Sequence, residues 1–314
     1  GKGAAVPFPP RSREAKTMQK KRFLMWAEKR SNVLLLLPSL MVLLIFGVYL
    51  IGALIYLSFC SWNVQTPAPA FNGIENYIAI VKDPNFWSSL GKTAIYVVSS
   101  VVAQVVLGFV VAYALNRRIL GLGILRTLMI VPMAMTPVIV GIFWKILLDP
   151  SLGPVNYYLS QIGITGPQWL ASKETALVSV ITVSVWASIP FCFLTITAGM
   201  NALPKDVYEA ATIDGATKFQ ALFKLTLPML KQVLLTLIIL RSIDALKAFD
   251  FIYTMTNGGP GDATQILPFY IYLKGFHWFD FGTAAALSVV LLVIAGILCK
   301  VFINRTGVKE FYEN

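Results

Sequence analysis

The residue types that most often carry catalysis or hold metal ions are few in this chain and lie far apart. Its 314 residues include one histidine, His277, and three cysteines, Cys60, Cys192 and Cys299. These residues form no CxxC pair and no set with the spacing of metal ligands. The chain also lacks a GxSxG motif. The sequence therefore predicts neither a metal site nor an enzyme active site.

Phosphate binding is the next chemistry to consider, because residues 91–93 (Gly-Lys-Thr) resemble the end of a phosphate-binding loop. However, Phe86 stands where the first glycine of that motif should be. Residues 121–123 (Gly-Leu-Gly) lack the third glycine of a dinucleotide-binding fingerprint. We therefore expect no ATP site and no cofactor on this chain.

Four ionisable residues stand inside an otherwise apolar stretch: Arg241, Asp244, Lys247 and Asp250. Their signs alternate at three-residue spacing, so each can reach the next on a helix. An ionisable group at membrane depth costs on the order of 2.5–3.5 kcal/mol on insertion scales. Two interpretations are open: a self-neutralised structural ladder, or side chains that line a polar cavity which a solute crosses.

The composition is that of a polytopic membrane protein. The chain is 57% hydrophobic and 13% charged, whereas soluble domains carry about 25% charged residues. Its mean hydropathy is +0.71. A membrane span needs about 20 mainly apolar residues, and six segments qualify: 33–60, 93–115, 125–148, 175–200, 229–253 and 283–303. The predicted fold class is therefore an all-α bundle of six transmembrane helices.

The net charge of +11 is compatible with nucleic-acid binding, with a basic soluble enzyme, or with basic cytoplasmic loops. Most Lys and Arg residues fall in residues 1–30, between the second and third segments, between the fourth and fifth, and after the sixth. Because cytoplasmic loops of membrane proteins carry such an excess, we expect both termini in the cytoplasm and no nucleic-acid partner.

The expected domain organisation has three parts. Residues 1–30 form a basic cytoplasmic segment that is partly disordered, residues 31–308 form the transmembrane domain, and residues 309–314 form a cytoplasmic tail. The first part lacks the short apolar core and cleavage site of a signal peptide. Residues 18–30 fit a basic helix on the membrane surface as well as an ordinary charged flank.

The longest predicted cytoplasmic loop, residues 201–228, has a pattern of its own. Pro204 suits the first position of a helix, and Gly215 suits its end because glycine reaches the left-handed conformation freely. A second amphipathic turn follows, with Phe219 and Phe223 on one face. The loop is therefore predicted to form two short helices joined by a glycine elbow, outside the membrane.

This loop resembles the EAA loop of the permeases of binding-protein-dependent ABC importers. The matching positions are Glu209, Ala210, Ala211, Gly215 and residues 225–228 (LTLP), and Asp214 belongs to the same predicted coupling segment. One departure is Gln232, where many members have a proline. The resemblance implies that the loop forms a coupling helix, which docks in a groove on an ATP-hydrolysing partner subunit.

The residue types of this loop suit such a role on physical grounds as well. Glu209 can pair with basic groups on a partner or cap its own helix, and the small side chains of Ala210 and Ala211 permit close approach. Gly215 lets the chain turn. A rigid peg of this kind can transmit motion between subunits as a rigid body.

The region from Arg241 to the sixth segment, including the turn at residues 257–260 (Asn-Gly-Gly-Pro), resembles the carbohydrate branch of the same family, of the maltose and glycerol-phosphate type. The resemblance implies a subunit in the bacterial inner membrane that pairs with a second, related permease. It also implies two ATP-binding subunits, which bind ATP and Mg²⁺, and an external solute-binding protein as partners.

The same resemblance implies where a solute contacts the chain. The positions fall late in the fourth segment and midway along the fifth: Ser184, Ala187, Ser188, Phe191, Arg241 and Ala245. Trp186 and Asp244 lie within the same stretches. Aromatic faces and hydroxyl groups suit sugars, although plain helix packing would also explain each aromatic residue. Arg241 favours an acidic or heavily hydroxylated solute unless Asp244 neutralises it.

The implied function is an import permease for a sugar, an oligosaccharide (acidic or neutral) or a polyol. Its outer loops, 61–92 and 149–174, carry tryptophans that suit either docking of the binding protein or anchoring at the membrane surface. An ion-driven transporter and a membrane enzyme are the alternatives; the first usually has internal repeats and more spans. Dependence on ATPase partners distinguishes them.

Overall fold

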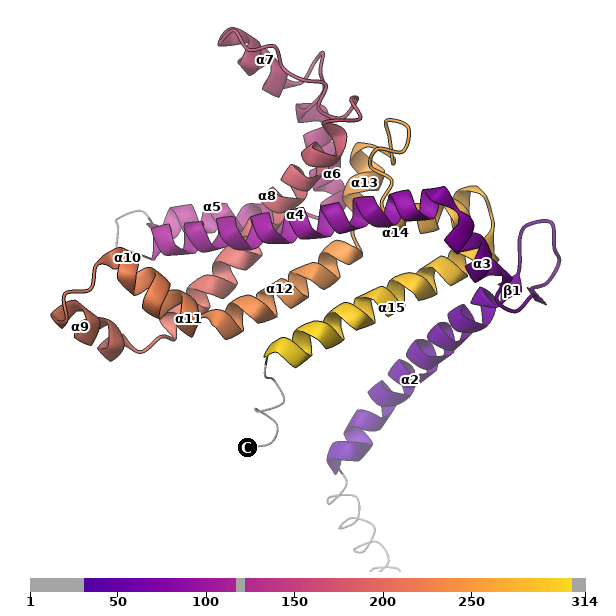
Figure 1. Ribbon diagram of the computed structural model, residues 1–314, viewed down its shortest axis with the longest axis horizontal. Coiled ribbons are helices and arrows are strands. Elements are labelled where there is room, and N and C mark those ends of the chain that lie inside the picture. Colours follow the sequence, from indigo (N-terminus) through magenta and orange to yellow (C-terminus); the bar gives the residue numbers. More distant parts are fainter. Residues whose placement is uncertain (1–30, 117–121, 307–314) are drawn as a thin grey trace, which may run out of the picture. The chain divides into compact units, whose positions relative to one another are not determined.

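The computed structural model describes residues 31–116 and 122–306, and most of them are helical (Figure 1). The segments 1–30 and 309–314 lie outside the described residues, and so does the end of the segment 31–308. The described elements are α2 (Ser31–Ser58), β1 (Cys60–Ser61), β2 (Ala70–Phe71), α3 (Glu75–Lys82), α4 (Pro84–Leu115), α5 (Leu122–Ala134), α6 (Pro137–Leu147), α7 (Pro154–Gln161), α8 (Ala176–Asn201), α9 (Lys205–Ile213), α10 (Lys218–Ala221), the π-helical turn η1 (Leu222–Thr226), α11 (Leu227–Met229), α12 (Lys231–Leu246), α13 (Asp250–Met255), α14 (Leu267–Tyr272), the π-helical turn η2 (Leu273–His277) and α15 (Phe281–Thr306).

Within these residues, 4 helices are long and apolar enough to cross a membrane by themselves. They are Leu36–Ser58, Pro84–Leu115, Ala176–Asn201 and Phe281–Asn304. Two further candidates are pairs of helices with a bend between them, α5 with α6 and the α10–α11 stretch with α12. Together these elements match the six predicted segments, and the all-α membrane fold is confirmed.

The second span is longer than predicted. Helix α4 begins at Pro84 and not near residue 93, because Asp83 caps it by accepting a hydrogen bond from the Asn85 N–H (2.9 Å) and a proline suits the first helical position. Residues 91–93, which resemble a phosphate-binding loop, therefore lie within a helix. Their backbone N–H groups are not arranged as a phosphate cradle.

The third span is broken. Helices α5 and α6 meet at a bend of 103°, and Thr136 between them has an extended backbone. Pro132 lies inside α5, and Pro137 occupies the first turn of α6. Because a proline cannot donate a backbone hydrogen bond and disfavours helical geometry in the residue before it, the helix stops at Ala134 and restarts at Pro137.

The fifth span is also interrupted, at two places. A bend of 63° precedes α12, and three residues separate the end of α12 at Leu246 from the start of α13 at Asp250. The prediction that all four charged residues lie on one helix is therefore wrong for Asp250. Asp250 starts a new helix, while Lys247 caps the end of α12.

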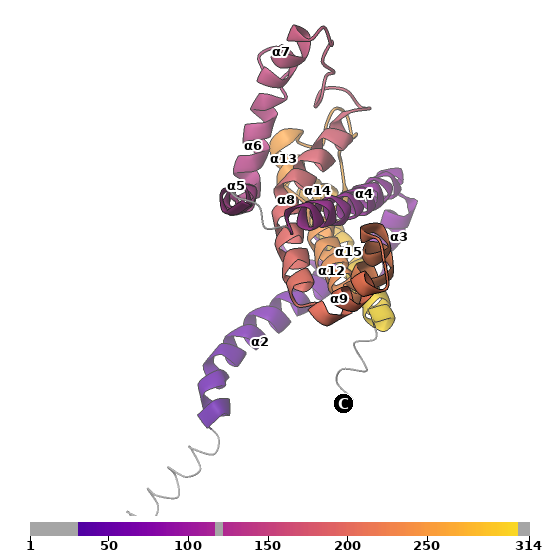
Figure 2. The same cartoon turned by 90° about the vertical axis from the view of Figure 1, so that its left-hand side faces the viewer.

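The chain divides into two compact units, residues 1–56 and residues 57–314. The described part of the first unit is most of α2, which carries apolar, exposed side chains such as Leu43 and Phe46. In the second unit, α4 crosses and packs against α8 and also contacts α12 (Figure 2). The main core lies among α4, α8 and the helices that follow α12, and it includes Tyr96, Val183 and Phe269.

The end of α4 nearest Pro84 is fixed by two carboxylates. Asp83 accepts a hydrogen bond from the Tyr270 hydroxyl of α14. Asp262, in the loop before α14, lies 2.6 Å from Lys92 Nζ. Hydrogen bonding by the Lys92 ammonium group lowers the pKa of the Asp262 carboxyl. These contacts fix the position of α4, which contributes to the polar site described below.

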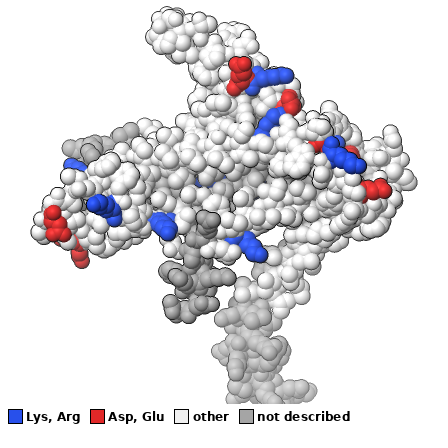
Figure 3. All heavy atoms as spheres, viewed as in Figure 1, with Lys and Arg blue, Asp and Glu red and all other residues white. Residues whose placement is uncertain are grey.

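Charged side chains gather toward the ends of the second unit (Figure 3). The face over the middle of α4 consists mainly of uncharged side chains (Figure 3). The middle of this helix carries exposed apolar residues such as Val98, Val102 and Val106. Apolar surface of this extent suits contact with lipid or with another membrane helix.

The crossing of α4 and α8 depends on a small residue. A Cβ atom at Gly108 would lie 2.4 Å from Cys192 Cβ, so the two backbones approach closely only because Gly108 has no side chain. We predict that Gly108→Ala lowers the unfolding midpoint of the detergent-purified protein, because overpacking costs about 1–3 kcal/mol. Thermal unfolding followed by thiol-reactive dye or tryptophan fluorescence measures this.

Gly91→Ala is the matched control, since a Cβ atom at this position of α4 meets nothing within 4 Å. It should leave the midpoint unchanged or raise it slightly, because alanine favours helix more than glycine does. Equal midpoints for the two variants would contradict the close crossing.

Candidate functional site

A cavity of about 450 Å³ lies where the two broken spans face α4 and α8. Its wall includes residues at the α5–α6 break, such as Met135, and residues at the α12–α13 break, such as Phe249. Helices α4 and α8 supply the remaining wall. Irregular backbone at membrane depth is tolerated where it lines a cavity or is buried in protein, so the breaks and the cavity belong together.

Arg241 of α12 is the central polar group of this cavity. Its Nε donates a hydrogen bond to Gln104 Oε1 of α4 (2.9 Å), and its Nη2 donates one to Ser188 Oγ of α8 (2.9 Å). Its Nη1 lies 3.3 Å from Asp244 Oδ2. The guanidinium carbon lies 5.5 Å from the centre of the Phe191 ring, within the range of a cation–π contact.

These four contacts come from three helices and fix the guanidinium plane. Only 16% of the Arg241 side chain is exposed, so the group is largely removed from water. Hydrogen bonds to charged groups contribute about 1.5–3 kcal/mol each, which is comparable to the cost of placing an arginine at membrane depth. Arg241 is therefore held in one orientation at the wall of the cavity.

Gln104 and Tyr96 are polar residues of this site that the sequence did not indicate. Gln104 is the one that contacts Arg241, and it is 1% exposed. A glutamine in the middle of an uncharged apolar segment was the available signal, because an amide buried in a bundle requires partners. Hydropathy averages conceal a single residue of this kind.

Ser184 and Tyr96 add a second polar contact to the wall. The Tyr96 hydroxyl donates a hydrogen bond to Ser184 Oγ (2.9 Å). Both side chains are buried in the bundle, and both line the cavity. The wall thus presents hydroxyl groups beside the guanidinium group.

The structure brings seven of the eight predicted solute-contacting residues to this cavity. Its lining includes Ser184, Ala187, Ser188, Phe191, Arg241, Asp244 and Ala245. Trp186 is the exception, since it lies outside the lining and packs edge-on against Trp144, with ring centres 5.4 Å apart. Successive residues of a helix point in different directions, and this separates Trp186 from its neighbours.

The cavity holds charges of both signs. Asp244 accepts the Arg241 contact and also lies 3.5 Å from Lys247 Nζ. Asp250 lies in the lining too. The Lys247 side chain is 66% exposed, so it is far more accessible to solvent than Arg241. Arg241, Asp244 and Lys247 therefore form a ladder of ion pairs, and all three also line the cavity. The two interpretations, a self-neutralised ladder and a lining of the solute path, are thus compatible.

The C-terminal end of α8 leads into α9, which contains Glu209, Ala210 and Ala211 (Figure 1). Pro204 precedes this helix as its N-cap with extended backbone and is not its first residue, as the sequence had suggested. Asp214 follows the helix as its C-cap. Gly215 has a φ angle of +79°, which confirms the predicted glycine elbow, because this conformation disfavours other residues.

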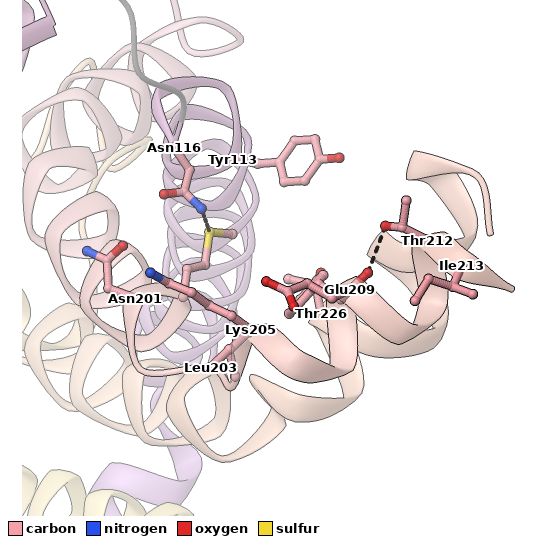
Figure 4. Close-up of a pocket in the computed structure, with 11 residues that line it drawn as sticks. Tyr113, Asn116, Asn201, Leu203, Lys205, Glu209, Thr212, Ile213 and Thr226 are labelled. Carbon is pink, nitrogen blue, oxygen red and sulfur yellow. Dashed lines mark hydrogen bonds between the residues drawn. The ribbon is translucent and has the colours of Figure 1, made fainter. Parts of the chain in front are cut away.

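Helix α9 borders a second cavity, of about 680 Å³, between itself and the ends of α4 and α8. Glu209 and Lys205 of α9 point into this cavity, toward the side where Asn116 and Asn201 lie (Figure 4). Glu209 is exposed. Its carboxylate therefore remains accessible to a group that enters from outside the chain.

The second helix of the loop begins with a capping box, in which Thr217 and Gln220 exchange hydrogen bonds. It continues through η1 and α11 to Met229. The rings of Phe219 and Phe223 lie 4.5 Å apart. Both are more than half exposed, at 70% and 51%, so an apolar face on this short helix has no cover within the described part of the chain.

A broken-span helical bundle with a polar central cavity and an external helical loop is the architecture of a membrane permease subunit. The family model described as "Binding-protein-dependent transport system inner membrane component" matches residues 104–306. This match covers more than half of the chain, and the chain belongs to this family. It is thus a transport subunit of the inner membrane, and ATP hydrolysis in such systems takes place on partner subunits.

Relatives of similar length support the assignment. The chain is 35% identical over 274 residues to the trehalose/maltose transport system permease protein MalF of Thermococcus litoralis, which covers 86% of this chain and 92% of the relative. It is 32% identical over 290 residues to the sulfoquinovosyl glycerol transport system permease protein SmoG of Agrobacterium fabrum, covering 92% and 94%.

Solved structures show the same fold. A chain of a bacterial ABC transporter involved in the import of the acidic polysaccharide alginate is similar to this chain with a TM-score of 0.79 and 21% sequence identity. The similarity covers 91% of this chain and 98% of that chain. At this level of identity the comparison concerns the fold and not the solute.

We predict that Gln104→Leu destabilises the bundle by about 1–3 kcal/mol, because it leaves Arg241 Nε without its acceptor at a buried position. Gln104→Glu keeps an acceptor oxygen and should be milder. Thermal unfolding of the purified protein measures both. Gln232→Leu, at an exposed position of α12, is the control, and a loss of stability as large in the control as in Gln104→Leu would contradict the role of Gln104.

Proposed function

We propose that this chain is the permease subunit through which a hydroxyl-rich solute, such as a sugar, an oligosaccharide or a polyol, crosses the membrane into the cytoplasm. The observation that carries the proposal is the fixed guanidinium group of Arg241 at the wall of a central cavity. It lies beside the hydroxyl of Ser188 and the ring of Phe191. Donors, acceptors and an aromatic face together suit a sugar ring.

The names of the relatives support this class of solute. Trehalose and maltose are neutral disaccharides, sulfoquinovosyl glycerol is an anionic glycoside, and a third relative from Agrobacterium fabrum, 31% identical over 262 residues, is named for sn-glycerol-3-phosphate transport. All of these solutes are rich in hydroxyl groups. These solutes differ in charge, so the charged residues that line the cavity are the feature that distinguishes between them.

The charges of the cavity favour a neutral or weakly anionic solute. Arg241 and Lys247 are balanced by Asp244 and Asp250, all four of which line the cavity. A strongly anionic solute would meet the carboxylate of Asp244, which is 52% exposed. The donors of Arg241 that are already engaged with Gln104 and Ser188 are less available to such a solute.

The loop of residues 201–228 is proposed to couple this cavity to ATP hydrolysis. Glu209, Ala210, Ala211, Asp214 and Gly215 form an exposed or half-exposed end of the molecule, which suits docking on an ATP-binding subunit. The excess of Lys and Arg in this loop and in residues 1–30 supports a cytoplasmic location for the loop and for both termini. The outer loops would then face the solute-binding protein.

The assembled importer would contain this chain, a second related permease, two ATP-binding subunits and the external binding protein. The two long apolar helices with the fewest buried residues, Leu36–Ser58 at 0% and Phe281–Asn304 at 11%, suit contact with the second permease and with lipid. ATP and Mg²⁺ would be bound by the partner subunits. Closure of those subunits would move the loop and switch the side on which the cavity opens.

The coupling role predicts that Glu209→Ala combined with Gly215→Pro abolishes the association with the ATP-binding subunits or uncouples their activity. Proline cannot adopt the positive φ angle of Gly215. Co-purification and ATPase assay of the reconstituted complex measure the two effects. Asp206→Ala, on an exposed position of the same helix, should leave both intact, and solute uptake by the native chain with no ATPase bound would overturn the proposal.

We predict that Arg241→Gln reduces solute uptake while the importer complex stays assembled. With trehalose, maltose, glycerol 3-phosphate and an alginate oligosaccharide as the test panel, uptake of the transported solute should fall about 10- to 100-fold, as expected for loss of a charged hydrogen bond. Lys247→Gln should have a smaller effect because this side chain is mostly exposed. Unchanged uptake in Arg241→Gln, with the complex intact, would show that the solute takes another route.

A further inference from the structure

Helix α9 stands apart from the bundle. None of its residues is buried. A cavity of about 680 Å³ separates it from the ends of α4 and α8, and another of about 280 Å³ lies between α9, Tyr113 and the short helix α10. Tyr208 and Thr226 belong to the lining of both cavities. These two residues therefore occupy the position where α9 reaches the rest of the molecule.

The two side chains are joined by a hydrogen bond. The hydroxyl oxygens of Tyr208 and Thr226 lie 2.9 Å apart. Among the described residues this is the side-chain hydrogen bond that connects α9 to another helical element. Thr226 is 6% exposed, and the bond is part-buried between the two cavities. A hydrogen bond that is partly removed from water is stronger than one in solution.

Thr226 also secures the π-helical turn in which it lies. Its Oγ1 donates to the Ala221 carbonyl oxygen (3.3 Å), five residues earlier. With its own hydrogen directed to Ala221, Thr226 Oγ1 accepts the hydrogen bond that the Tyr208 hydroxyl donates. π-helical turns are uncommon and often accompany functional positions. The contact thus joins α9 to the irregular turn η1, which leads through α11 into α12.

The backbone offers a less rigid connection between the same elements. It runs from α9 through Gly215, whose φ angle is +79° and whose missing Cβ would meet nothing within 4 Å. Such an uncrowded elbow bends without displacing neighbours. The Tyr208–Thr226 bond bypasses the elbow, since it links the middle of α9 directly to the last residue of η1.

We propose that the Tyr208–Thr226 hydrogen bond is the strut that transmits a displacement of α9 to α12 and thereby to Arg241. This inference rests on the coupling role proposed for α9. Tyr208 and Thr226 are positioning residues in this account, because neither touches the central cavity. When the strut is intact, α9 and α12 move together; when it is absent, the elbow at Gly215 absorbs the movement of α9.

The test uses the complete importer complex with spin labels on pairs of introduced cysteines, in a background whose native cysteines are replaced by alanine. One pair, Asp206→Cys and Leu240→Cys, reports the distance between α9 and α12. The second, Val106→Cys and Leu240→Cys, reports the movement of α12 against α4. The three positions, Asp206, Val106 and Leu240, are all exposed. Distances are measured by pulsed electron resonance without nucleotide and with MgATP plus vanadate.

In the wild type, nucleotide should change the α12–α4 distance and leave the α9–α12 distance constant. In Tyr208→Phe and Thr226→Val, the α12–α4 change should be lost or at least halved, while the α9–α12 distance should now change. Thr226→Ser retains the hydroxyl and should behave as the wild type. Tyr113→Phe removes another hydroxyl from the same two cavities and should also have no effect.

The outcomes separate this inference from the proposed function. Co-purification of the ATP-binding subunits with each variant shows that the loop is still folded and docked. If the wild type responds to nucleotide and Tyr208→Phe responds equally, the strut is wrong while the coupling role of α9 stands. If the wild-type distances do not respond to nucleotide at all, the proposed coupling role fails and the strut fails with it.

Discussion

The guanidinium group of Arg241 joins three helices at a depth where an unpartnered charge could not be held. Gln104 of α4, Ser188 of α8 and Asp244 of α12 each contact it. The bundle must bring these helices together before the charge is satisfied, so the network favours one arrangement of α4, α8 and α12. Close approach of α4 and α8 at Gly108 makes this arrangement sterically possible.

The interruptions of the third and fifth spans have the same physical basis. Both breaks lie in the wall of the Arg241 cavity, at residues such as Met135 and Phe249. A continuous helix would present a smooth face there, whereas a break exposes backbone and changes the direction of the side chains. The cost of freed backbone groups is acceptable where they face a polar cavity. The cavity, the breaks and the charged ladder thus form one structural unit.

Much of this architecture followed from the sequence, because apolar length, proline position and charge distribution act locally. The six segments, the glycine elbow at Gly215 and the cluster around Arg241 are of this kind. The start of α4 was misplaced because Asp83 and Pro84 precede a stretch that is only partly apolar. Gln104 was missed and Trp186 was included because both depend on which face of a helix meets the cavity, a property of packing between distant segments.

Cryo-electron microscopy of the complete importer, trapped with solute and its binding protein, would show directly whether the solute passes through the Arg241 cavity. We expect solute density in contact with the guanidinium group of Arg241, Ser188 and Phe191. Solute density that lies elsewhere in the membrane domain, with the contacts of Arg241 to Gln104 and Asp244 unchanged, would contradict this expectation and would assign Arg241 a purely structural role.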